Sequence, residues 1–94
     1  MTRDSYISHL EDQLARVDAD LALARKRIDD GPAEGRAKAL DDWSGLKIRH
    51  EDLAARIQAA KAEGADKWSA LHAGFREEAD ALSDALERWL EKAA

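Results

Sequence analysis

Cysteine is absent from this 94-residue sequence, and proline, aromatic and β-branched residues are few. Without cysteine the chain can form no disulfide bond, no thiolate nucleophile and no sulfur-ligated metal site. One proline and five glycines supply few turns, and the shortage of isoleucine, valine and threonine leaves little from which to build strands. Charged residues make up 37% of the chain, and alanine supplies much of the 45% that is hydrophobic. This composition is typical of long helices.

Long apolar runs and basic patches are missing as well. No stretch free of Asp, Glu, Lys and Arg comes near the roughly 20 residues that cross a bilayer. The net charge is −5, and the one tight basic cluster, Arg25, Lys26 and Arg27, is followed at once by Asp29 and Asp30. We therefore expect no membrane-spanning segment and no nucleic-acid interface, and the charge pattern does not favour membrane binding. Because the first residues also lack the apolar segment of a signal peptide, we expect a cytoplasmic protein.

Two short segments have the composition of helix breaks. Residues 29–32 read Asp-Asp-Gly-Pro, and glycine is the preferred residue just after a helix, whereas proline can open the next helix but not continue the last. Residues 63–66 read Glu-Gly-Ala-Asp, in which Gly64 could end one helix and Asp66 could cap another. These breaks predict a single helical domain, residues 1–94, with helices at about 3–30, 33–63 and 66–93.

Apolar residues recur at alternating spacings of three and four along each segment, which is the seam pattern of a coiled coil. The first segment keeps the spacing without a miss, the second is interrupted by His50, and the third slips by one residue between Phe75 and Ala79. An antiparallel hairpin about Gly31 places in one layer those residues whose numbers sum to about 63. The layers expected on this basis are Leu21 with Trp43, Val17 with Leu46, Leu14 with His50, Leu10 with Leu53, and Ile7 with Ile57.

The fold predicted by these patterns is all-α, an antiparallel coiled-coil-type three-helix bundle. One alternative stays open, because a single glycine costs an uninterrupted helix only about 1 kcal/mol. If Gly64 does not break the chain, residues 33–93 form one long helix. The molecule would then be a helical hairpin that dimerises.

His50 is the most informative polar residue, because it occupies a seam position. For a turn about Gly64 the matching sum is near 128, which places His50 level with Glu78, and we expect a partly buried pair of these two side chains. Such a pair would stabilise the bundle at low pH and lose that contribution as the pH rises. The alternative is a neutral His50 bonded to a hydroxyl, a carbonyl or water, in a role that only fixes the register.

No pattern of catalytic or metal-binding residues is found. A di-iron bundle would need glutamate three residues before histidine on two helices, but His9, His50 and His72 follow other residues at that spacing. No two histidines lie within one helical turn, as a zinc-binding helix requires. Adjacent acids such as Asp41 and Asp42 point about 100° apart on a helix and build no acid and base pair. We expect no enzyme, no cofactor, no metal and no small-molecule substrate.

Three tryptophans, Trp43, Trp68 and Trp89, lie on the seams, where large aromatic side chains are expected to fill the core. Three further apolar residues fall off the seams. The candidate contact surface therefore consists of Leu23, Ile48 and Leu90, against the alternative that they are ordinary scattered surface residues.

Residues 64–75 read Gly-Ala-Asp-Lys-Trp-Ser-Ala-Leu-His-Ala-Gly-Phe. They resemble a Gly-Asp-x-Trp-x-x-Leu-x-x-Gly-[Val/Phe] stretch of small bacterial coiled-coil proteins, mostly uncharacterised, some of which are described as stress-response proteins. Asp66 is displaced by one position from the usual Gly-Asp pair. The resemblance implies alanine-rich, charged heptads along the chain and no catalytic residues to carry over.

Taken together, these features predict a non-enzymatic structural or protein-interaction module whose partner is another protein or a second copy of itself, as in a homodimer. The alternative function is a stress-associated protectant that binds exposed apolar surfaces or membranes. That function would require a loosely packed fold, whereas regular seams with three tryptophans favour a well-packed one.

Overall fold

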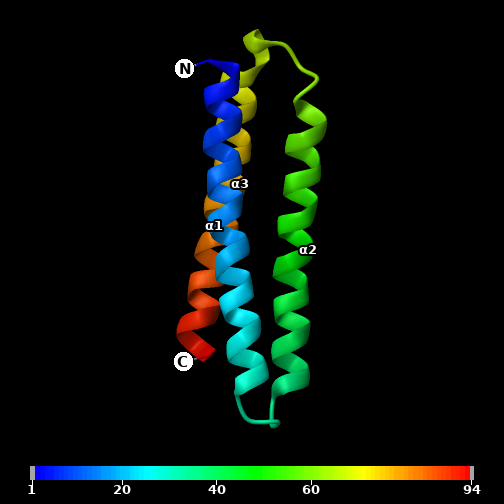
Figure 1. Ribbon diagram of the computed structural model, residues 1–94, viewed down its shortest axis with the longest axis vertical. Coiled ribbons are helices and arrows are strands. Elements are labelled where there is room, and N and C mark those ends of the chain that lie inside the picture. Colours follow the sequence, from blue (N-terminus) through cyan, green and yellow to red (C-terminus); the bar gives the residue numbers. More distant parts are fainter. Residues whose placement is uncertain (1, 94) are drawn as a thin grey trace.

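The structure is a computed structural model that describes residues 2–93, and these residues form three helices and no strand. Helix α1 spans Arg3–Asp30, α2 spans Arg36–Ala60 and α3 spans Ala65–Ala93. In the view of Figure 1 helix α1 runs down, α2 up and α3 down, so that neighbouring helices in the sequence are antiparallel. The rod that they form measures 51 × 19 × 16 Å. Each helix contacts both others. The prediction of an all-α three-helix bundle is confirmed, and the alternative of one long helix over residues 33–93 is wrong.

Specific residues define where α1 begins, and the turn that follows α1 is longer than the sequence suggested. Helix α1 is capped by Thr2, whose side chain accepts a hydrogen bond from the backbone N–H of Ser5 at 3.1 Å. After α1 the chain does not re-enter a helix at residue 33 as expected, and α2 begins only at Arg36. The reason is Gly35. Its φ of 78° lies in the left-handed region, and the residue ends a separate turn before the helix. Arg36 then donates to the carbonyl oxygen of Gly31 at 2.7 Å and so closes the loop.

The second turn comes earlier than expected. Helix α2 ends at Ala60 rather than at residue 63, and residues 61–64 form the connection before α3 begins at Ala65. The Arg3 side chain, at the start of α1, donates to the carbonyl oxygens of Lys61 and Glu63. The turn is therefore held to the N-terminal end of α1, which fixes the point where the chain folds back.

Two glycines provide a matched test of these local effects. Gly35→Ala is expected to lower the free energy of unfolding by about 1 kcal/mol, because alanine is strained in the left-handed region. Gly45→Ala is expected to raise it by about 0.5–1 kcal/mol, because Gly45 lies within α2 with open space where a Cβ would stand. Urea unfolding of both variants measures the two shifts, and the same sign in both would contradict this account.

The core consists of two apolar clusters stacked along the rod. The upper cluster, beside the 61–64 turn, draws buried residues from all three helices, including Leu10, Ile57 and Trp68. In the lower cluster, beside the 31–35 loop, the fully buried residues come from α1 and α3, and α2 contributes only the partly buried Trp43 and Leu46 among the described residues. The bundle is therefore closed at its upper end and more open between α2 and α3 at its lower end.

The register of the first hairpin agrees with the expected layers at two levels. The indole N–H of Trp43 donates to the carbonyl oxygen of Leu21 at 2.8 Å. Nε2 of His50 lies 3.0 Å from the carbonyl oxygen of Leu14. Both contacts cap backbone carbonyls of α1 with side chains of α2, so that the two helices are joined by directional bonds as well as by apolar packing.

Candidate functional site

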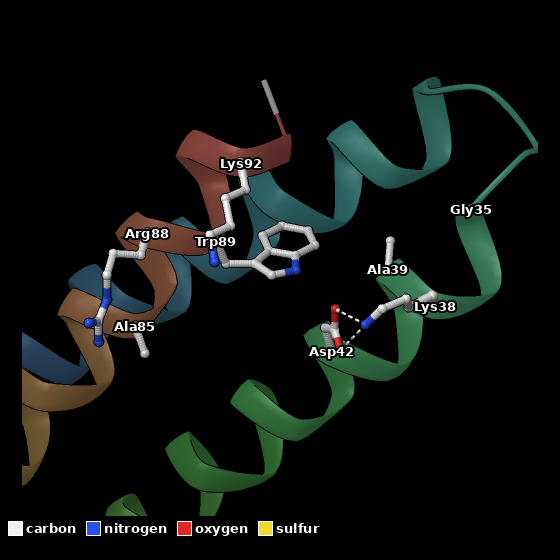
Figure 2. A pocket seen from close by; sticks show the side chains of 8 residues that line it. All are labelled: Gly35, Lys38, Ala39, Asp42, Ala85, Arg88, Trp89 and Lys92. Carbon is white, nitrogen blue, oxygen red and sulfur yellow. Dashed lines mark hydrogen bonds and ion pairs between the residues drawn. The ribbon is translucent and has the colours of Figure 1, made fainter.

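An open hollow lies between α2 and α3 at the lower end of the bundle. It has a volume of about 650 Å³. Figure 2 shows the Trp89 indole extending from α3 across this space towards Ala39 on α2. Trp89 is only half-buried, because the residues opposite it, Gly35 of the 31–35 loop and Ala39 of α2, are small where a larger side chain would have enclosed it. A second hollow of about 210 Å³, towards the 31–35 loop, shares the same three residues.

A further hollow of about 230 Å³ follows the same pair of helices towards the upper end. Its floor contains Leu53 of α2 and Leu82 of α3, together with the small side chain of Ala81. We call this hollow and the 650 Å³ hollow together the α2–α3 groove. Small residues along the groove would allow another backbone to approach closely. Leu53 and Leu82 are already buried, so the apolar surface that would gain from being covered is that of Trp89.

The rim of the α2–α3 groove is charged. Lys38 and Asp42 form an ion pair at 3.2 Å on the α2 side of the lower hollow, which Figure 2 shows by dashed lines. Arg88 and Lys92 stand opposite on α3, one helical turn apart. Both pairs of residues are exposed, so that the groove has a polar rim around an apolar floor. This is the usual anatomy of a protein interface.

The expected pair of His50 and Glu78 is not formed. His50 instead contacts the Leu14 carbonyl oxygen on α1, which agrees with the alternative of a histidine bonded to a carbonyl. Glu78 instead accepts hydrogen bonds from Arg56 of α2. The layer sum gave the height of each residue along the rod but not the side of α2 on which it lies, and His50 lies on the α1 side.

The proposed contact surface of Leu23, Ile48 and Leu90 is not a single surface in the structure. Leu23 and Ile48 are exposed, at 45% and 65%, but they lie on different helices and neither lines the α2–α3 groove. Leu90 is partly buried against the lower core cluster. The spacing of apolar residues could not show the groove, because spacing assigns Trp89 to the core whether or not α2 covers it, and in the structure α2 leaves it partly uncovered.

A pair of histidines that the sequence patterns did not single out joins α1 to α3 near the upper end. Nδ1 of His9 lies 2.9 Å from Nε2 of His72, and the Tyr6 ring lies 4.7 Å from the His72 ring, between centroids. His72 is 8% exposed. Burial lowers the pKa of His72 below its ordinary value of 6.5, and the nearby His9 and Arg76 lower it further. Within residues 2–93 no group of three or more potential ligands is arranged to hold a metal ion.

No family model, no curated protein and no solved structure matches this chain. No helix among the described residues is long and apolar enough to cross a membrane.

Proposed function

We propose that the protein is a non-enzymatic interaction module that binds another protein in the α2–α3 groove. The observation that supports this proposal is the half-buried Trp89, which lines two open hollows. Tryptophan is the side chain that most often dominates the binding energy of an interface, because it contributes a large apolar area at a small cost in conformational entropy. A partner that covers Trp89 would complete the packing that α2 leaves unfinished.

Site-specific photocrosslinking in the cells that make the protein tests this proposal. A photoreactive phenylalanine analogue at Ala85, in the groove, is compared with the same analogue at Ala73, which is exposed on the same helix. We expect a crosslinked product from Ala85 and none from Ala73. The partner identified by mass spectrometry is then purified, and Trp89→Ala is expected to weaken its binding about 30-fold, as loss of a central tryptophan typically does.

Two outcomes would count against the proposal. Equal crosslinking from both positions, or none from either, would show that the groove is not a contact surface. A product of twice 10.4 kDa from Ala85 alone would instead identify a second copy of the chain as the partner. Light scattering over a hundredfold range of concentration would then show a stable mass above that of the monomer.

A further inference from the structure

The three spaces between the helices differ in the sign of their charge. The α2–α3 groove is lined by five basic residues and two acidic ones. The space between α1 and α3 has two basic and three acidic residues, and the space between α1 and α2 has two acidic and none that are basic apart from His50. In a chain whose net charge is −5, the α2–α3 groove is thus a local region of positive charge.

The acids of the groove are already neutralised inside it. Asp42 pairs with Lys38, and Glu78 pairs with Arg56. The other three cations of the groove are Arg49, Arg88 and Lys92, and none of them makes an ion pair with any residue of the described range 2–93. An anionic partner would therefore find three available cations without having to displace an internal bond.

The length and floor of the groove suit a helix. On α2 the lining residues run from Lys38 to Arg56, which corresponds to about 27 Å and would accommodate a helix of about 18 residues. Ala81 and Ala85 on the α3 wall are small enough to let helix axes approach within about 8–10 Å. A helix lying there would convert the open side of the three-helix bundle into a four-helix arrangement.

We infer that the occupant of the α2–α3 groove is an acidic amphipathic helix of another protein. This inference rests on the proposed function. The apolar face of that helix covers Trp89 and the alanines, and its carboxylates lie within reach of Arg49, Arg88 and Lys92. A second copy of this chain fits less well, because the large apolar residues exposed on the described part of the chain are Leu23 and Ile48, which stand on separate helices and form no apolar stripe.

Two synthetic helical peptides of about 18 residues test the inference with the intact protein. They share the same leucine and alanine positions and differ only in carrying glutamate or lysine on the polar face. We expect calorimetry to detect binding of the glutamate peptide and not of the lysine peptide, with an affinity that falls as the salt concentration rises. The double variant Arg88→Glu and Lys92→Glu is expected to weaken binding at least tenfold.

The matched control is the double variant Arg16→Glu and Lys26→Glu, which makes the same change of net charge on α1 and should leave the affinity within about twofold. Circular dichroism checks that both double variants keep their helices.

Equal binding of the two peptides, no binding of the glutamate peptide at about 1 mM, or equal effects of the two double variants would overturn the inference. If crosslinking from Ala85 still identified a partner, the proposed function would stand and only the charge assigned to the partner would fall. If the protein forms a dimer, and the double variant Arg88→Glu and Lys92→Glu abolishes it while the control variant does not, the occupant of the groove is a second copy of this chain.

Discussion

Trp68→Ala is expected to destabilise the bundle by about 3–5 kcal/mol, which is a large part of the 5–15 kcal/mol that small domains possess. Trp68 is fully buried in the upper cluster, with its ring centroid 6.3 Å from that of Phe75. Removing the indole would leave a cavity at the one level where all three helices contribute buried residues to the core. Urea unfolding followed by circular dichroism measures the change, and far-ultraviolet spectra show whether the variant still folds.

Trp68→Phe separates packing from hydrogen bonding at the same site. The indole N–H of Trp68 is buried and finds no hydrogen-bond partner among the described residues, so it carries a cost of desolvation that phenylalanine would remove. We expect this substitution to cost about 1 kcal/mol or less, because the gain partly offsets the smaller ring. A cost equal to that of Trp68→Ala would show that the indole N–H has a partner, such as a bound water molecule.

The helical class, the number of helices and the register of the first hairpin could all be predicted, because heptad spacing reports directly on which residues face the core. Every seam residue predicted for the first helix is buried in α1. In the stretch 64–75 the large apolar residues Trp68, Leu71 and Phe75 all pack in the upper cluster, so that their spacing is explained by the core. Such a pattern identifies a helix that packs and carries no information about a partner.

The candidate site could not be predicted in the same way. A seam pattern says that a residue faces the core but not how well the neighbouring helix covers it, and the exposure of Trp89 depends on the small residues of α2 opposite. Apolar spacing also does not determine on which side of its helix a polar side chain lies. His50 was therefore expected beside Glu78, whereas it contacts α1, and the approach of His9 to His72 was not singled out.

Acidification from pH 7 to pH 5 is expected to destabilise the protein, and His72 is expected to account for a measurable part of the effect. Burial, with His9 and Arg76 nearby, lowers the pKa of His72 in the folded protein below the 6.5 of an ordinary histidine. The unfolded chain therefore takes up a proton at a higher pH than the folded one. The stability that neutral His72 contributes is complete above about pH 6.5 and is lost as the pH falls towards the lowered value.

His72→Gln should reduce the slope of the unfolding free energy against pH over this window, because glutamine does not titrate but can still donate to Nδ1 of His9. The control is Leu86→Ala, at the lower end of α3, which is expected to lower stability at every pH and to keep the wild-type slope. Both variants keep every carboxylate of the wild-type chain, so that carboxylate protonation contributes equally to both slopes. An NMR titration of the imidazole resonances provides the second measurement. A midpoint for His72 above 6.5, or a steeper slope in His72→Gln, would show that the pairing with His9 favours the protonated ring and that acid strengthens the joint between α1 and α3. An unchanged slope would show that His72 contributes nothing to the pH dependence.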